Sequence, residues 1–382
     1  MKQALIIVCM LILSISGIAA EMVKLSAENN SVQVISSSST ETILQFNISQ
    51  FSQEKVVIDG SDWYHINLLK EGITQDKGFP QLPVFNRSII IDNNARMKLE
   101  VYDVLYQDIA LRVAPSKGII TRDIDPATVP YTFEKVYLGR DFYPNALAEL
   151  SEPYILRDFR GITVKTVPFA YNPETQTLRI FTSYKVRVYQ DGTDERNVLN
   201  TFSTTVSREF APIYENHFVN WNTYRYTPVS DTFGKMLVIC HTNYMSTILP
   251  YVNWKKQKGI ETELIQWSTI GTTAANLQTY IQDRYNADTS IAYIQIVGDA
   301  PQVPSLSSGG GGSDPSFSLV AGGDNYPDIF IGRFSAEIHT KPCRSRVSAL
   351  FNSGPIPRLI VRYLIFPLHL GQRTGTTRNR MK

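Results

Sequence analysis

The chain has 382 residues, of which 43% are hydrophobic and 11% aromatic, so it can bury more than one core and its length predicts two or three domains. Its 37 basic and 35 acidic residues give a formal net charge of +2, which gives no reason to expect nucleic acid as a partner. Three cysteines are too few for a disulfide-stabilised scaffold, so the fold depends on its hydrophobic cores.

The N-terminal segment has the features of a secretory signal peptide. Residues 1–20 start with a lysine at position 2, continue with an apolar run from Ala4 to Leu13 and end in small residues. This arrangement predicts cleavage between Ala20 and Glu21. The run is too short to favour a permanent membrane span, with an uncleaved anchor as the alternative, and no later stretch has the length and apolarity of a transmembrane helix. We therefore expect an exported, extracytoplasmic protein.

Residues 21 to about 205 have the patterns of β structure. Segments such as TETILQFNISQF, VYDVLYQDIAL and TLRIFTSYKVRVYQDG alternate apolar and polar residues or are rich in β-branched and aromatic ones. Turn-forming segments such as IDGSD, APSKG and YNPETQT separate them, and no sustained helical period is present. This half of the chain predicts an antiparallel β-sandwich or a barrel-like domain.

After residue 233 the pattern changes to alternating strands and helices. Helical spacing that includes Met245 and Val252 predicts a helix over 243–259, although Pro250 lies inside it, and a second helix is predicted over 273–286. Short apolar runs predict strands at 235–240, 260–267, 291–297 and 329–331. Strands that alternate with helices predict a parallel sheet covered by helices, so the boundary between a β domain and an α/β domain falls near 206–233.

The last 45 residues differ in composition from the rest of the chain. They contain nine Lys or Arg and no Asp or Glu, which leaves 28 basic and 35 acidic residues, a net of −7, in residues 1–337. No strand or helix pattern in this tail continues the predicted sheet. The tail is either a basic appendage or a segment in which the reading frame has been lost, and we favour the second interpretation because local pattern and global fold normally agree.

Several stretches of the chain, in this order, resemble the gingipain family of secreted bacterial cysteine endopeptidases. The likeness runs from about residue 85 to Glu337 and more loosely back to residue 21. SEPYILRDFRG and PFAYNPETQTLRIFTSYKVRV resemble the end of the propeptide, and RYTPV resembles the junction. The first part of the catalytic domain is resembled by YVNWKKQKGIETELI, AYIQIVGDAPQVP and GGDNYPDIFIGRFSAE. The resemblance implies a β-sandwich-like propeptide followed by an incomplete caspase-like α/β domain, in a zymogen exported to the periplasm, outer surface or exterior of a bacterium.

The resemblance divides the chain into four parts. We expect a signal peptide over 1–20, a β-rich propeptide over 21–225, the first part of the catalytic domain over 226–337 and an aberrant basic tail over 338–382. The bond Arg225–Tyr226 resembles the processing site between propeptide and enzyme. An exposed, proline-flanked linker between two domains is also where proteases reach the backbone, with an ordinary uncut linker as the alternative.

The propeptide also contains a candidate inhibitory loop. In KGIITRDIDPATVP the side chain of Arg122 lies in a turn-rich segment between predicted strands. Because propeptides block their enzymes by placing chain in the active cleft, the resemblance implies that Arg122 occupies an Arg-accepting pocket. The alternative is a surface salt bridge, which is the usual role of an exposed arginine.

The chain offers no convincing catalytic dyad. In the family, the catalytic His and Cys lie beyond the point at which this sequence departs from the pattern, at Glu337. Cys240 and His241 are adjacent in a predicted strand, so their side chains point to opposite faces, and Cys240 is better explained as a small core residue. His339 and Cys343 lie in the aberrant tail. We therefore assign no catalytic residue and predict that the chain is inactive as a peptidase.

A candidate metal site follows the third strand of the α/β part. The segment AGGDNYPD places Asp324 and Asp328 in a glycine-rich loop, and hard oxygen ligands on a turning backbone suit calcium. Family members bind structural calcium in this part of the domain, so the two carboxylates and the carbonyls of Ala321 and Tyr326 are candidate ligands. A solvated acidic loop is the alternative.

Three functions remain open from the sequence. The first is the zymogen of a secreted cysteine endopeptidase that acts on protein or peptide substrates, here incomplete. The second is a non-enzymatic propeptide that inhibits or helps to fold a related cysteine peptidase. The third is a secreted β-sandwich binding module with a degenerate α/β partner. Hydrolysis of Arg- or Lys-peptides would support the first function, inhibition of a relative the second, and the lack of both the third.

Overall fold

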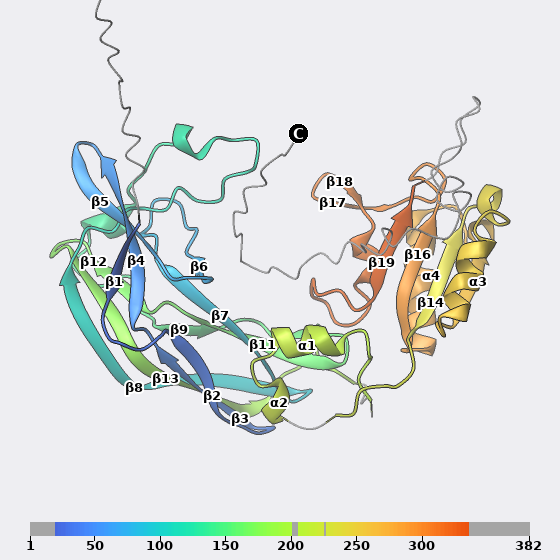
Figure 1. Ribbon diagram of the computed structural model, residues 1–382, viewed down its shortest axis with the longest axis horizontal. Coiled ribbons are helices and arrows are strands. Elements are labelled where there is room, and N and C mark those ends of the chain that lie inside the picture. The colour runs from blue at the N-terminus through green and yellow to red at the C-terminus, as the bar shows by residue number, and fades with distance from the viewer. Residues whose placement is uncertain (1–19, 201–204, 225–226, 336–382) are drawn as a thin grey trace, which may run out of the picture.

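The computed structural model describes residues 20–200, 205–224 and 227–335, and its strands belong to two regions (Figure 1). The β region consists of antiparallel sheets built from strands β1 to β13, and the α/β region contains a parallel sheet with helices. The predicted architecture, an antiparallel β part followed by a parallel sheet flanked by helices, is confirmed.

The β region contains three sheets. Their strand orders are β1-β4-β5, then β10-β11-β7-β6 with β9 paired to β11, and β12-β13-β3-β2 with β8 paired to β13. The bounds are β1 Glu21–Lys24, β2 Ser31–Ser37, β3 Glu41–Asn47, β4 Gln50–Ile58, β5 Ser61–Asn67, β6 Gly72–Ile73, β7 Pro83–Ile90, β8 Ala95–Ala110, β9 Ala148–Leu150, β10 Tyr154–Leu156, β11 Phe159–Thr166, β12 Phe169–Asn172 and β13 Thr177–Thr193. Two short 3₁₀ helices, η1 Pro126–Thr128 and η2 Lys135–Leu138, lie in the long connection between β8 and β9.

Alternation along the strands places one core between these sheets. In β3, Leu44 and Phe46 are fully buried while their neighbours are partly exposed, and β13 buries Tyr184, Val186 and Val188 in the same way. The rings of Phe46 and Tyr184 are stacked with centroids 4.9 Å apart. A period of two therefore directs one face of each long strand into a shared core, as the sequence predicts.

The α/β region is built on a four-stranded parallel sheet. Its order is β15-β14-β16-β19, and all three pairings are parallel. Helices α3 and α4 cover opposite faces, because α4 packs with Leu237 and Ile239 while α3 packs with Met236 and Val238. The bounds are β14 Lys235–Cys240, α3 Leu249–Gln257, β15 Thr262–Gln266, α4 Ala274–Ala287, β16 Ile291–Val297, β17 Leu306–Ser308, β18 Gly311–Ser313 and β19 Phe330–Phe334, with 3₁₀ helices η3 Thr242–Tyr244, η4 Trp267–Thr269 and η5 Pro315–Ser318.

The first helix of this region is shorter than the sequence predicts. It begins at Leu249 rather than near residue 243, with Pro250 in its first turn, and Met245 lies outside it. Proline lacks a backbone N–H and is favoured at the start of a helix, so Pro250 marks the beginning of α3 and not a defect inside it. By contrast, α4 begins where predicted, because Thr273 and Asn276 form a reciprocal capping box.

The segment that joins the two regions packs on the β region. It contains α1 Ala211–His217 and α2 Trp221–Tyr224. The fully buried Asn220 accepts a hydrogen bond from the backbone N–H of Ile90 at 2.8 Å and donates one to its carbonyl at 3.1 Å. Val206 and Val229 form an isolated parallel bridge, so the two sides of the predicted processing site are hydrogen-bonded to each other.

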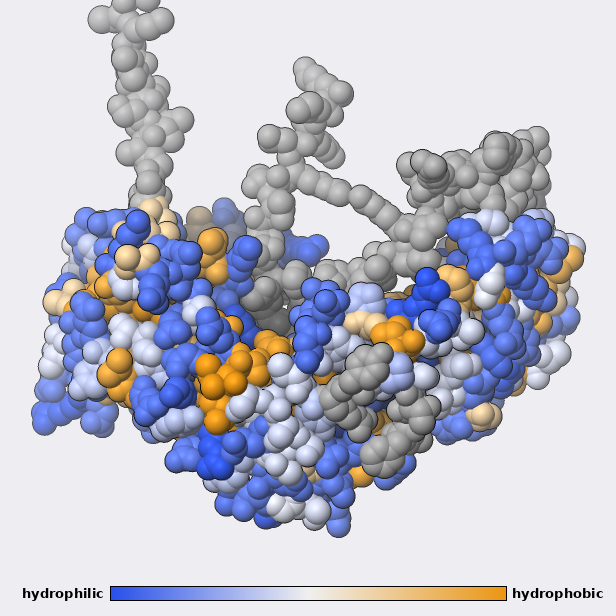
Figure 2. All heavy atoms as spheres, turned by 60° about the horizontal axis from the view of Figure 1, so that its bottom comes forward, coloured by the Kyte–Doolittle hydropathy of each residue, from blue (hydrophilic) through white to orange (hydrophobic). Residues whose placement is uncertain are grey.

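Most of the surface shown in Figure 2 is hydrophilic, and its hydrophobic groups are small and separate. No helix within the described residues has the length and apolarity needed to cross a membrane. Three predicted features lie outside the described residues: the signal peptide up to residue 19, the processing bond and the basic tail.

Candidate functional site

The turn of one hairpin in the β region contacts the α/β region. Strands β10 and β11 are joined by only two residues, Arg157 and Asp158. Arg157 has a φ of 47°, in the left-handed region where two-residue hairpin turns usually have Gly or Asn. Holding a non-glycine residue in this conformation costs on the order of 1–3 kcal/mol. We therefore expect the side chain of Arg157 to make contacts that offset this cost.

The side chain of Arg157 is buried in the α/β region. Its Nη1 donates to the carbonyls of Ile291 at 3.0 Å and Asp328 at 2.5 Å, and its Nη2 donates to the carbonyl of Thr289 at 2.5 Å. Only 2% of the side chain is exposed. The guanidinium also lies over the ring of Tyr285, 5.5 Å from its centroid. A charged group from one region therefore replaces its hydration with the backbone carbonyls of the other.

The carboxylate of Asp328 completes this contact from the other side. Its Oδ1 accepts the backbone N–H of Arg157 at 2.8 Å, and its Oδ2 accepts the N–H groups of Val320 at 3.0 Å and Ala321 at 2.8 Å. Asp328 is fully buried, and this burial raises its pKa to about 7, against the opposing effect of the three N–H donors. One buried side chain thus holds both the hairpin turn and its own loop.

Asp324 makes a second bond of the same kind. Its Oδ2 accepts the N–H of Ile155 at 2.7 Å, and its Oδ1 accepts the N–H of Tyr326 at 2.9 Å. Burial raises the pKa of Asp324 above its usual value. In the same loop, the N–H of Gly323 donates to Oδ1 of Asn197 in the β region at 2.8 Å. Loop 319–328 therefore lies along the hairpin and is hydrogen-bonded to it at several points.

The carboxylate oxygens expected as calcium ligands already accept hydrogen bonds in this structure. Each carboxylate oxygen of Asp324 and Asp328 accepts at least one N–H, and Ala321 and Tyr326, expected as carbonyl ligands, direct their N–H groups at these carboxylates. Within the described ranges no group of three or more His, Cys, Asp or Glu side chains could hold a metal ion. Calcium at this loop stays a prediction, and we derive no chemistry from it.

Aromatic rings from both regions surround this contact. Tyr154 of β10 is stacked on Tyr326 with ring centroids 3.9 Å apart, and Phe210 lies 4.7 Å from Phe330 of β19. A hydrogen bond of 2.7 Å joins the hydroxyl of Tyr154 to Nε2 of His217, whose pKa burial lowers to about 4. His217 is therefore a neutral, packed side chain at neutral pH.

Arg122 lies elsewhere, in an exposed loop of the β region. Its side chain is exposed, and it takes part in no ion pair with another described residue. The loop itself is ordered by local bonds: Asp125 caps η1 by accepting the N–H of Ala127 at 2.9 Å, and Nζ of Lys117 donates to the carbonyl of Pro126 at 2.9 Å. Two apolar side chains close to Arg122 are exposed as well, Ile119 at 75% and Ile124 at 45%.

Cys240 is a core residue, as the sequence predicts. It is fully buried at the end of β14, and its Sγ donates to the carbonyl of His241 at 3.3 Å. Burial raises the pKa of the thiol to about 12, so it is protonated at neutral pH. It is the one cysteine among the described residues. A thiol held in this state is not a nucleophile.

We expect Cys240 to resist alkylation in the folded chain. A thiol with a pKa of about 12 has a thiolate fraction on the order of 10⁻⁵ to 10⁻⁴ at pH 7.5, and burial blocks access in addition. Iodoacetamide treatment at pH 7.5, followed by mass spectrometry of the peptide that contains Cys240, should find it unmodified until urea is added. Rapid labelling of the native chain would show that the residue is exposed and activated.

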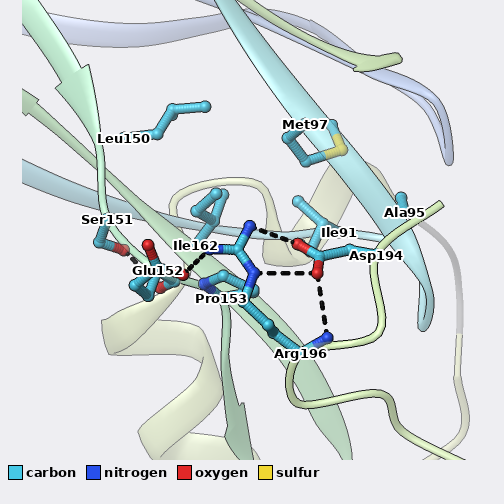
Figure 3. Close-up of a pocket in the computed structure, with 10 residues that line it drawn as sticks. All are labelled: Ile91, Ala95, Met97, Leu150, Ser151, Glu152, Pro153, Ile162, Asp194 and Arg196. Atoms are coloured by element: carbon cyan, nitrogen blue, oxygen red, sulfur yellow. Dashed lines mark hydrogen bonds and ion pairs between the residues drawn. The ribbon is translucent and has the colours of Figure 1, made fainter. Parts of the chain in front are cut away.

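The β region also has a cavity of about 200 Å³ at its surface (Figure 3). Arg196 lines it and pairs with Asp194 at 2.7 Å and with Glu152, and the hydrogen bond from Arg196 lowers the pKa of Asp194 to about 2. None of the predicted site residues lines this cavity. Its lining is Ile91, Ala95, Met97, Leu150, Ser151, Glu152, Pro153, Ile162, Asp194 and Arg196.

The remaining predicted sites stay predictions. Ala20 and Glu21 are both exposed, and Glu21 begins β1. Arg225 and Tyr226 lie outside the described residues. The structure thus brings Asp324 and Asp328 together at one contact and leaves Arg122 apart from it. Sequence reasoning missed Arg157; its one signal was an arginine in a two-residue turn where glycine or asparagine is usual.

Both parts of the chain match models of one peptidase family. Residues 23–230 match the model described as Propeptide_C25, and residues 230–340 match Peptidase family C25. Gingipain R1 of Porphyromonas gingivalis is 36% identical over 273 residues, which are 70% of this chain and 27% of that protein. Gingipain R2 of the same species is 35% identical over 273 residues, 70% of this chain and 37% of that protein. Lys-gingipain is 22% identical over 362 residues, 88% of this chain and 20% of that protein. The chain thus spans 20% to 37% of the length of these relatives.

Two solved structures, the first of them from Porphyromonas gingivalis, are similar in part. The complex of the RgpB pro- and mature domains is 31% identical and covers 51% of this chain and 100% of the matched chain, with a TM-score of 0.47. The Arg-specific cysteine proteinase gingipain R is 34% identical and covers 30% of this chain and 27% of that one, with a TM-score of 0.27.

Proposed function

The chain belongs to peptidase family C25, the gingipain family, with a propeptide followed by the start of a peptidase domain, and we propose that it acts as an inhibitory propeptide rather than as a peptidase. Its target is a cysteine endopeptidase of the same family, either its own parent enzyme or a relative. We propose that it is exported from the cytoplasm of a bacterium, since its N-terminal segment has the pattern of a signal peptide.

The exposed loop around Arg122 carries this proposal. A substrate-like inhibitor needs a basic side chain that is free to enter a pocket, on a segment that is held in place by its own contacts. Arg122 is exposed and takes part in no ion pair with another described residue, while Asp125 and Lys117 order the loop around it. The exposed Ile119 and Ile124 add apolar surface that an enzyme cleft can cover.

The state of Cys240, the one cysteine among the described residues, supports the proposed lack of peptidase activity. Peptide hydrolysis by this family needs a thiolate and a histidine that generates it. Cys240 is a buried, protonated thiol that donates to a backbone carbonyl, so it cannot serve as the nucleophile. We therefore expect the chain to bind a family peptidase without hydrolysing peptides itself.

An Arg122→Ala chain tests this function. Inhibition of a complete Arg-specific C25 peptidase should weaken about 100-fold, because one buried anchor residue typically contributes 2 kcal/mol or more to such an interface. A fluorogenic Arg-peptide substrate reports the remaining activity at each inhibitor concentration. The Arg112→Ala chain is the matched control, since Arg112 is another basic residue of the β region that lies outside this loop. Equal inhibition by all three chains would reject the role of Arg122.

A further inference from the structure

The buried contact of Arg157 with the α/β region lies outside the inhibitory loop around Arg122. We propose that Arg157, Asp324 and Asp328 form an anchor that holds the propeptide on the α/β region without the covalent linker and without Arg122. We call these three residues the Arg157 anchor. The proposal rests on the propeptide function above and specifies how the propeptide recognises its partner: the anchor binds the first α/β part of a C25 peptidase domain, in this chain or in a complete enzyme.

The direction of the hydrogen bonds supports this proposal first. The guanidinium of Arg157 donates only to backbone carbonyls, those of Thr289, Ile291 and Asp328, and all three lie in the α/β region. Its own β region offers the guanidinium an ion pair with Asp158 at 3.8 Å from Nε and the ring of Phe210. The Nη1 and Nη2 groups of Arg157 therefore have hydrogen-bond acceptors only while the α/β region is in place.

The backbone hydrogen bonds of the hairpin turn are a second observation in favour of the anchor. The N–H groups of Ile155 and Arg157 donate to the carboxylates of Asp324 and Asp328 across the contact. Each region thus supplies both donors and acceptors, and separation of the two leaves buried polar groups on both sides to be hydrated. Reciprocal bonding of this kind fixes the relative position of the partners more strictly than apolar contact alone.

The left-handed backbone conformation of Arg157 is a third observation in favour of the anchor. At a φ of 47°, glycine or asparagine would suit the turn better than arginine. Backbone strain of this kind persists where the surroundings determine it, and it is found at ligand-binding positions. Lys70 provides a comparison, because it has a φ of 67° in another turn of the β region, yet its side chain is exposed whereas that of Arg157 is buried.

The anchor is tested by cutting the linker. A recognition sequence for a specific protease is placed at 225–226 of the full chain, and size-exclusion chromatography after cleavage reports whether the two parts stay together. We expect the parts of the unmodified chain to co-elute, and Arg157→Ala to weaken their association at least 100-fold. Arg122→Ala should leave the association unchanged, because Arg122 lies outside the anchor.

A glycine pair separates binding from folding. Arg157→Gly and Lys70→Gly both relieve a left-handed φ, so neither is expected to lower the stability of the β region. Only Arg157→Gly should weaken association of the cut parts. If Arg157→Gly and Lys70→Gly chains both co-elute like the unmodified chain, the anchor is rejected, whatever the result for Arg157→Ala.

Substitutions on the two sides of the anchor should have opposite effects on the inhibition of a separate, complete peptidase. In the intact chain, Arg157 is already bound to the α/β region of the same chain. A complete peptidase must therefore displace that α/β region before it can bind Arg157. Asp328→Ala frees Arg157 and should strengthen inhibition of that peptidase at least tenfold, whereas Arg157→Gly should weaken it. Equal effects of the two substitutions would reject the anchor as the recognition element. Lack of inhibition by every chain, with normal co-elution of the cut parts, would reject the inhibitory function and leave the anchor standing.

Discussion

Replacing Asp328 with alanine is expected to open the contact between the two regions and to cost about 3–5 kcal/mol of its stability, the range for removing one partner from a buried charged network. The substitution removes the acceptor of three N–H groups, those of Arg157, Val320 and Ala321, in a fully buried position. Two of these belong to loop 319–328 and one to the β region, so both are affected at once.

Hydrogen exchange followed by mass spectrometry reports this effect directly. Peptides that cover 154–158 and 319–328 should exchange much faster in the Asp328→Ala chain than in the unmodified chain. Peptides from β3 and β13 should exchange as before, because these strands bury their own core and do not touch Asp328. Unchanged protection at 154–158 would contradict the role assigned to this carboxylate.

The same residue gives the contact a pH dependence. Burial raises the pKa of Asp328 from 3.8 to about 7, with Asp324 adding repulsion, and Tyr285, Asp158 and the guanidinium of Arg157 also face this site. A group whose pKa is raised on burial adds stability that is complete below its unfolded pKa and lost as the pH rises through the folded value. The contact should therefore be tighter at pH 5 than at pH 8.

Asp328→Asn provides the control for this dependence. The amide keeps one accepting oxygen and cannot titrate, so the association of linker-cut parts should vary less between pH 5 and pH 8 in this chain than in the unmodified one. If both chains show the same dependence, it arises from another group, and the protonation state assigned to Asp328 is wrong.

Arg160→Ala is expected to lower the stability of the β region itself by about 3–5 kcal/mol. Arg160 is fully buried, and its guanidinium donates to four backbone carbonyls within this region, at 2.7 to 3.1 Å. These carbonyls belong to Asp92, Ala95, Arg196 and Asn197. Alanine leaves them buried without a donor and leaves a cavity beside them.

Urea unfolding followed by far-ultraviolet circular dichroism measures this loss. The matched control is Arg187→Ala, since Arg187 is 42% exposed and its ion pairs with Glu41 and Glu100 lie at the surface. Surface pairs contribute about 0–1 kcal/mol, so this control should change the midpoint little. A midpoint for Arg160→Ala equal to that of the control would contradict the structural role of the buried arginine.

Local patterns in the sequence predicted most of the elements. The run KMLVIC corresponds to β14 without an error at either end, because a buried parallel strand is apolar on both faces. The capping residues Thr273 and Asn276 likewise mark the start of α4. The apolar spacing before Pro250 misled the prediction of α3, because residues 242–244 form a 3₁₀ turn and the helix begins only at Leu249.

The contact between the regions could not be predicted from the sequence. The sequence located Asp324 and Asp328 as a loop of chemical interest, but the N–H groups of the β region that they bind are 169 and 171 residues away in the chain. No local pattern reports a partner at that separation. The same holds for Arg157, whose acceptors belong to another region and follow from tertiary packing alone.

The inhibition constant of the unmodified chain for a complete Arg-specific C25 peptidase tests the central claim most directly. We expect a value below about 1 µM, equivalent to a binding free energy of about −8 kcal/mol, and no hydrolysis of the substrate by the chain alone. Full peptidase activity in the presence of a large excess of the chain would contradict the inhibitory function. Hydrolysis by the chain itself, blocked by a thiol reagent, would show that it is an enzyme.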